Sequence, residues 1–221
     1  MLLGVAYFPP ISYFALIAEG MVLPSRTAGV VAGEVKPSVV CIEACETYQK
    51  QSWRNRCRIY AADGPQYLNF PIVHEGTHEL PIREIRVDYS TPWVLRTERA
   101  ITSAYESSAY FDYYKDELFA ILDSKPETLF ELDLRIIRFF LRKTGIAADI
   151  RFTTEYVPVS PVPDYRALIH PKRPDTILYD LGLEKPYFQV FARKHGFIPN
   201  LSIMDLLFNE GPDSILYLKA F

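Results

Sequence analysis

The chain has 221 residues, a formal net charge of −3, 49% hydrophobic residues and 14% aromatic residues. This composition predicts a packed core and excludes disorder throughout the chain. The length suits a single domain over residues 1–221. A slightly acidic chain lacks the basic surface that binders of double-stranded nucleic acid need, so we expect no such partner.

Cysteine content and hydropathy suggest a cellular compartment. The chain has an odd number of cysteines, three, which is typical of reduced thiols rather than a disulfide framework. The first apolar run has no basic segment ahead of it and is cut by Pro9 and Pro10, unlike a secretory signal. No apolar run approaches the roughly 18 residues that cross a bilayer. We therefore expect a soluble, cytoplasmic protein without a membrane span.

The first half of the chain predicts short strands around one helix. Residues 11–19 repeat apolar side chains at helical spacing before Gly20, which predicts a helix. Residues 21–38 are rich in Gly and Pro, so we expect a loop insertion there. Asp63 and Gly64 separate two strand-like runs and predict a hairpin. The stretches with strand patterns are 2–8, 39–44, 57–61, 66–73 and 82–89.

The second half predicts mostly helices. Helical patterns cover 92–108, 110–123, 128–144, 187–195 and 202–210, and one strand is expected over 149–157. Ser124 with Glu127, and Ser202 with Asp205, have the spacing of a capping box. We expect an α/β fold: an N-terminal strand–helix–strand unit and a hairpin region form a mixed sheet, followed by a largely helical second half.

One short stretch, "KQSWRNRCRI", places four cations between Lys50 and Ile59. If the stretch is extended, Arg54, Arg56 and Arg58 share a face; if it is helical, Lys50 replaces Arg56 in the group. Arginine pairs bidentately with phosphate and carboxylate groups, so the group predicts a site for a small anion. The alternative is a charged, solvated strand edge that resists aggregation.

Other polar residues suggest weaker sites. Glu43 follows an apolar run and is either a base, an orienting carboxylate or an ion-pair partner of the arginines. Cys41 and Cys45 lack zinc-site spacing and are expected to be core thiols. His74 and His78 flank Gly76 in a predicted loop, where an exposed polar loop is expected rather than a metal site.

Three stretches resemble the WbqC-like family: "AYFPPISYFALIA", "ETYQKQSWRNRCRI" and "HGFIPNLSIMDLLFNEGPDSILYL". The resemblance covers nearly the whole chain except about 21–38. It implies a cytoplasmic role in bacterial surface-polysaccharide (O-antigen) biosynthesis, with transfer or modification of a group on an activated sugar. The family's most recognisable residues are Glu43, Tyr48, Lys50, Gln51, Arg54, Asn55, Arg56, Asn200, Ser202 and Asp205.

Two functional hypotheses follow. The first is a transferase-type enzyme, without metal or cofactor, that acts on a phosphate- or nucleotide-activated small molecule with Glu43 as its catalytic residue. Its expected substrate-binding residues are Tyr7, Tyr48, Lys50, Gln51, Arg54, Asn55, Arg56 and Asn200. It requires Glu43, Arg54, Arg56 and Asn200 to line one pocket.

The second hypothesis is a non-catalytic interaction protein. The aromatic segment 110–119 and the arginines would bind a protein partner or single-stranded RNA, which is recognised by aromatic and Arg side chains together. The same segment also fits an amphipathic helix with its aromatic side chains in the core.

Overall fold

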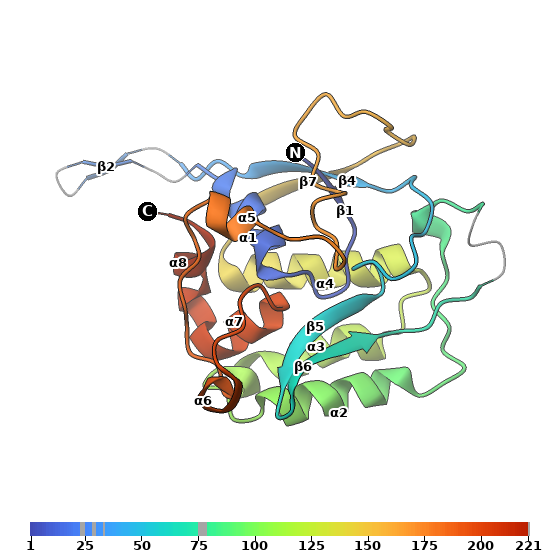
Figure 1. Ribbon diagram of the computed structural model, residues 1–221. Coiled ribbons are helices and arrows are strands. Elements are labelled where there is room, and N and C mark those ends of the chain that lie inside the picture. The colour runs from blue at the N-terminus through green and yellow to red at the C-terminus, as the bar shows by residue number, and fades with distance from the viewer. Residues whose placement is uncertain (23–24, 28–29, 33, 75–78, 221) are drawn as a thin grey trace.

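A three-stranded parallel sheet forms one side of the computed structural model (Figure 1). Its strands, in the order β1-β4-β7, are β1 (Leu2–Gly4), β4 (Ser38–Glu43) and β7 (Ala148–Phe152). All three point the same way, so their carboxyl ends meet at one edge. The structure describes residues 1–22, 25–27, 30–32, 34–74 and 79–220.

Helix α1 (Ile11–Glu19) joins the first two strands of this sheet through the core. Every residue from Ile11 to Ala18 is buried, because the helix lies between the sheet and the C-terminal helices. The rings of Phe8 and Phe14 both approach Phe140, at centroid distances of 6.2 Å and 6.0 Å, and tie this region to α4. The predicted first helix is confirmed.

Three long helices cover the middle of the chain: α2 (Trp93–Tyr105), α3 (Phe111–Asp123) and α4 (Leu129–Thr144). Figure 1 shows α4 running beneath the parallel strands and α2 at the opposite side of the molecule. The expected capping box at Ser124 and Glu127 is wrong. Thr128 caps α4 instead, and its hydroxyl accepts from the Glu131 N–H at 3.2 Å. Gly145 ends the helix with a left-handed φ of 74°.

Short helices fill the C-terminal part: α5 (Ile177–Asp180), α6 (Ala192–His195), α7 (Ile203–Glu210), η2 (Gly211–Ser214) and α8 (Ile215–Leu218). Ser202 caps α7 as expected, but the Asp205 side chain accepts from Tyr187 and Gln189 rather than from the Ser202 N–H. The helix expected over 187–195 is limited to the single turn α6. The α/β class with a largely helical second half is confirmed.

Two antiparallel hairpins stand outside the parallel sheet. β5 (Arg56–Ala61) pairs with β6 (Gly64–Asn69), and Gly64 has a φ of 108° at the predicted turn. β2 (Ser25–Thr27) pairs with β3 (Val30–Ala32) within the expected insertion, and Figure 1 shows β2 projecting from the body of the molecule. The parallel and antiparallel strands therefore belong to separate sheets rather than to one mixed sheet.

The strand expected over 82–89 is wrong. This segment begins with the 3₁₀ helix η1 (Ile82–Glu84) and continues with isolated bridges. Its backbone N–H groups bond to different neighbours: Ile82 to the Glu46 carbonyl at 2.7 Å, and Val87 to the Glu127 carbonyl at 3.0 Å. The apolar pattern correctly marked buried side chains, since Ile82, Ile85 and Val87 are buried. The segment is not a strand, because no single neighbouring strand pairs with its backbone along its length.

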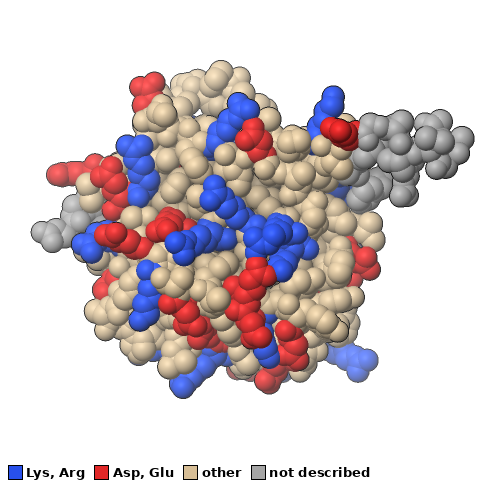
Figure 2. Space-filling view, turned by 180° about the vertical axis from the view of Figure 1, so that it is seen from behind, with Lys and Arg blue, Asp and Glu red and all other residues tan. Residues whose placement is uncertain are grey.

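The face opposite to that of Figure 1 carries charges of both signs. Lys and Arg side chains gather near its centre with Asp and Glu side chains beside them (Figure 2). The ion pairs of the described residues include Arg135 with Glu131 at 2.6 Å and Arg151 with Asp149 at 2.7 Å. Within the described ranges, no helix combines the length and hydropathy that a membrane span requires.

Candidate functional site

A polar pocket of about 300 Å³ lies where the loops after β4 and β7 meet. Both loops leave the carboxyl edge of the parallel sheet, where open α/β sheets bind their ligands. This cavity is hereafter the polar pocket. Its lining residues are Glu46, Gln49, Tyr156, Pro158, Asp164, Arg166, Ala167, His170 and Arg173.

Glu43, the last residue of β4, is completely buried and joins the two loops behind this pocket. Its Oε1 accepts from the Cys45 N–H at 2.9 Å and the Thr153 hydroxyl at 2.6 Å. Its Oε2 accepts from the Val157 N–H at 3.2 Å and from Arg166 Nη1 at 3.0 Å. A carboxylate with four donors and no exposure orients its neighbours and has no open position for a substrate proton.

The Arg166 guanidinium, like the Glu43 carboxylate, is engaged by hydrogen bonds to other groups of the protein. Its guanidinium donates to Glu43, to the Asp164 carboxylate at 2.6 Å and to the Val157 carbonyl at 2.7 Å. Its side chain is 10% exposed. Hydrogen bonds from Arg166 lower the pKa of Asp164, so both stay charged. The carboxylates of Glu43 and Asp164 balance the charge of Arg166. Arg166 therefore helps to form the wall of the pocket but adds no net positive charge to it.

Arg54 is buried beside the pocket, with 2% of its side chain exposed. Its Nε and Nη2 both donate to Glu46 Oε1, at 3.0 Å and 2.7 Å. The guanidinium lies against Gly4 so closely that a Cβ on this glycine would be 2.4 Å from Nη2. Arg54 and Arg166 also line one cavity of about 10 Å³.

A buried carboxyl group, Asp133 of α4, lies within electrostatic reach of Arg54. Burial raises the pKa of Asp133 well above its usual range, and the positive charge of Arg54 opposes this shift. Neither carboxyl oxygen has a hydrogen-bond partner within the described part of the chain. Burial therefore favours the protonated, uncharged form of this group.

Three cations that act on His170, namely Arg56, Lys172 and Arg173, are not balanced by a carboxylate of the described residues. None has an ion pair among the residues that the structure describes: Arg173 donates to the Ala167 carbonyl at 3.1 Å, and Arg56 lies over the Tyr67 ring at 5.8 Å. Together with Arg54 they act on His170.

His170 lines the polar pocket, and nearby positive charges affect the pKa of its imidazole. Burial is the main cause of its lowered pKa, and the charges of Arg54, Arg173, Lys172 and Arg56 lower it further. The Lys172 N–H donates to Nδ1 at 3.2 Å, so the proton of the neutral ring is on Nε2. The pocket thus offers unpaired positive charge and one neutral N–H donor.

Several expected substrate-binding residues lie apart from this pocket. Tyr7 is fully buried, and its ring packs against Phe70 at 4.7 Å; burial raises its pKa well above the usual range. Tyr48 is half-buried against the core, and burial is also the main cause of its raised pKa. Asn55 donates to the Phe70 carbonyl at 2.9 Å and so joins the start of β5 to the end of β6.

Lys50 and Gln51 are exposed in the turn that follows Gln49, a lining residue of the polar pocket, and Gln51 has a φ of 58°. The basic stretch is neither one strand nor one helix, because β5 begins only at Arg56. Arg54 and Arg56 therefore do not share a strand face.

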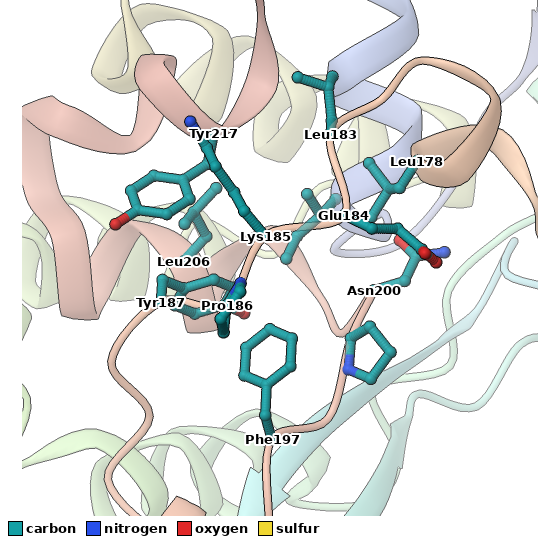
Figure 3. Close-up of a pocket in the computed structure, with 12 residues that line it drawn as sticks. Leu178, Leu183, Glu184, Lys185, Pro186, Tyr187, Phe197, Asn200, Leu206 and Tyr217 are labelled. Atoms are coloured by element: carbon teal, nitrogen blue, oxygen red, sulfur yellow. The ribbon is translucent and has the colours of Figure 1, made fainter.

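Asn200 supports a second cavity. Its Oδ1 accepts from the Ser12 N–H at 2.9 Å, and its Nδ2 donates to Asp175 at 2.8 Å, so it closes the first turn of α1. The cavity has a volume of about 400 Å³, is mostly apolar and is hereafter the apolar pocket (Figure 3). Its lining residues are Ile11, Leu178, Leu183, Glu184, Lys185, Pro186, Tyr187, Phe197, Pro199, Asn200, Leu206 and Tyr217.

The requirement that Glu43, Arg54, Arg56 and Asn200 line one pocket is not met, because Asn200 lies at the apolar pocket. Sequence reasoning missed the residues of the loop after β7, which supply Asp164, Arg166, His170 and Arg173. Their signal is the charge-rich stretch "DYRALIHPKR", which follows the strand predicted over 149–157 after a Pro-rich segment of six residues.

Within the described ranges, no group of three or more His, Cys, Asp or Glu side chains could hold a metal ion. His78 lies outside the described residues, so the predicted pair with His74 has no structural description. The three cysteines are free thiols. Cys41 and Cys45, which were expected to be core thiols, are only partly buried, whereas Cys57 is buried.

Comparison with known proteins gives one family. The model of the WbqC-like protein family matches residues 35–168. This segment includes most of the polar pocket, and the lining residues of the apolar pocket all lie outside it. "Uncharacterized protein Rv1507c" of Mycobacterium tuberculosis (strain ATCC 25618 / H37Rv) is 28% identical over 200 residues, which cover 78% of this chain and 84% of that protein. No solved structure matches.

Proposed function

The chain belongs to the WbqC-like protein family, and we propose that it is a transferase-type enzyme that binds a phosphate- or nucleotide-activated small molecule in the polar pocket. This proposal replaces the single site that the sequence hypothesis required, because Glu43, Arg54, Arg56 and Asn200 do not line one pocket. The observation that carries this proposal is the guanidinium of Arg173, which lines a pocket at the carboxyl edge of a parallel sheet and has no ion pair among the described residues. In line with the family resemblance, we place the protein in the cytoplasm and in bacterial surface-polysaccharide (O-antigen) synthesis.

In this proposal the anionic group contacts Arg173 and accepts a hydrogen bond from Nε2–H of His170. Both residues line the pocket. Arg173 keeps most of its donors, because only Nη1 has a partner, the Ala167 carbonyl. A planar guanidinium and a neutral N–H donor together suit the oxygens of a phosphoryl group.

The buried ion pairs have a different role. Arg54 with Glu46, and Arg166 with Glu43, hold the two loops that form the pocket walls. We therefore assign Glu43 as a positioning residue, the orienting alternative of our sequence hypothesis, and not as the base. Catalysis would come from holding the substrate and stabilising charge on the leaving phosphate.

Lys50 and Gln51 contribute at the pocket's outer edge in this proposal. They follow Gln49 in an exposed turn, and Lys50 has no ion pair among the described residues. An exposed lysine of this kind steers an anion toward the pocket and adds little to its final affinity.

The alternative, a partner-binding surface formed by segment 110–119, has less support. Phe111 and Leu118 are buried in the core, and Phe119 is partly buried against it. Tyr113, at 78% exposure, is the large side chain of this segment that stays at the surface. One exposed ring gives a weak platform for RNA bases or for a protein.

Titration calorimetry with pyrophosphate and with a panel of nucleotide sugars tests the proposal. Arg173→Gln should weaken pyrophosphate binding about tenfold, the equivalent of about 1.4 kcal/mol. Arg138→Gln is the matched control, because Arg138 is an exposed arginine on α4 outside the pocket. Unchanged binding by Arg173→Gln would reject the site, and absence of nucleotide release with every donor of the panel would reject the transferase.

A further inference from the structure

The apolar pocket is independent of the proposed function, because it shares no lining residue with the polar pocket. A volume of about 400 Å³ suits a small molecule rather than a helix or strand of a partner. Its walls come from segments far apart in the chain, including Ile11 of α1, Leu206 of α7 and Tyr217 of α8.

Three aromatic rings form one side of this pocket in nearly perpendicular orientations. Tyr187 meets Phe197 at a centroid distance of 5.3 Å and an angle of 88°, and Tyr217 at 5.7 Å and 71°. Buried Asp205 holds Tyr187 in place by accepting its hydroxyl at 2.5 Å. Edge-to-face packing of this kind makes the three rings one aromatic wall of the pocket. A ring face that borders the pocket attracts an organic cation that comes within about 6 Å of the ring centroid.

The charges at the pocket are separated. Figure 3 shows the Glu184 carboxylate on the side of Asn200, and the Lys185 side chain extending toward Tyr217. The Lys185 ammonium lies 4.8 Å from the Tyr217 ring centroid and donates to the Leu216 carbonyl, so this ring already attracts a cation of the chain itself. Glu184 is exposed and has no ion pair or hydrogen bond among the described residues.

We propose that the apolar pocket binds a small organic ammonium ion with an apolar body. The cation lies between the Glu184 carboxylate and the aromatic rings, and the body packs against Leu178 and Leu206. The positive charge of Lys185 repels the ligand cation and competes with it for the face of the Tyr217 ring. The carboxylate therefore selects for the ligand, and the lysine limits its affinity.

Titration calorimetry with benzyltrimethylammonium tests the proposal, with benzyl alcohol and phenylacetate as uncharged and anionic counterparts. The ammonium ion should bind about threefold to tenfold more tightly than the alcohol, and phenylacetate more weakly than either. Glu184→Gln should remove this preference, whereas Lys185→Met should tighten ammonium binding about threefold. Glu106→Gln, a matched loss of charge on an exposed residue outside the pocket, should change nothing.

Equal binding of the three probes would overturn the proposal. So would shifts of the two variants in the same direction, or absence of ammonium binding by the folded protein. Near-UV circular dichroism of each variant establishes that the aromatic side is intact. Pyrophosphate titration of the same variants separates the two sites, because neither Glu184 nor Lys185 lines the polar pocket.

Discussion

Arg54 and Arg58 lie four residues apart in one basic stretch, yet each supports a different pocket. Arg54 is buried and pairs with Glu46 at the polar pocket. Arg58 Nη2 donates to the carbonyls of Pro199 and Asn200, at 3.2 Å and 3.4 Å, and holds the loop of the apolar pocket. The polar pocket is thus held by buried charge pairs, and the apolar pocket by packing and bonds to neutral carbonyls.

This difference predicts where substitutions cost stability and where they cost binding. A buried charge that loses its partner is strongly destabilising, whereas an exposed charge contributes little. The residues around the polar pocket should therefore divide into a framework that affects unfolding and a few free cations that affect binding. The apolar pocket should tolerate loss of its charges.

The largest effect is expected at the buried pair. Arg54→Met leaves Glu46 buried without its partner, so the free energy of unfolding should fall by about 3–5 kcal/mol. Urea denaturation measures this change. The double variant Arg54→Met with Glu46→Leu should recover most of the loss, and Glu184→Gln at the apolar pocket should lose less than about 0.5 kcal/mol. A double variant as unstable as the single one would contradict this account of the pair.

A pH dependence distinguishes the support of the apolar pocket. Burial raises the pKa of Asp205 from 3.8 to about 6. Between these values the folded state binds a proton that the unfolded state does not, so stability falls as pH rises from about 4 to about 6. The fall is on the order of 3 kcal/mol.

Urea denaturation at pH 4, 5, 6 and 7 tests this slope. Asp205→Asn cannot titrate, so the part of the slope that Asp205 causes should disappear. Asp180→Asn is the control, because Asp180 is an exposed carboxylate of α5. An Asp205→Asn variant with the wild-type slope would show that another group titrates in this range.

A smaller effect is expected where Arg54 meets the first strand. Gly4→Ala would bring a Cβ within 2.4 Å of Arg54 Nη2, so the guanidinium must move from its position against β1. Overpacking of this kind costs about 1–3 kcal/mol, measured as a lower urea midpoint. Gly182→Ala, where nothing lies within 4 Å but φ is 67°, is a control for backbone strain without a clash. An unchanged midpoint for Gly4→Ala would mean that Arg54 has room to shift.

The smallest effect is expected for Arg58. Arg58→Met removes the two bonds to the loop at Pro199 and Asn200, and such bonds contribute about 1 kcal/mol in net terms. Pyrophosphate affinity should stay unchanged, while binding of benzyltrimethylammonium should weaken about twofold to threefold because the loop is less ordered. Weaker pyrophosphate binding by Arg58→Met would contradict this assignment, because it would mean that Arg58 takes part in anion binding at the polar pocket.

Local patterns identified much of the fold. The helical periodicity of 92–144 predicted α2, α3 and α4, and Asp63-Gly64 predicted the β5–β6 hairpin. Each depends on residues a few positions apart, which the sequence displays directly. The prediction of a strand over 82–89 was wrong, because alternating apolar side chains indicate which residues are buried but not whether a neighbouring strand is present for hydrogen bonding.

The candidate site could be predicted only in part. The sequence identified Glu43 and Arg54 as unusual, because charges within or beside apolar runs stand out. It could not tell that both are occupied by partners, since Glu43 bonds to Arg166 across 123 positions of the chain. Which cations remain unpaired, Arg173 above all, depends on such distant contacts.

The sequence by itself determined the α/β class, the helices of the middle segment and the family, because these depend on periodicity and short motifs. The tertiary structure alone decided that two loops meet at the carboxyl edge of the sheet and divide the charges into paired and unpaired groups. A side chain's charge is set by its chemistry, but its availability to a ligand is set by its neighbours in space. In this protein the ion-pair partner lies 123 positions away in the chain for Glu43 and only eight away for Arg54.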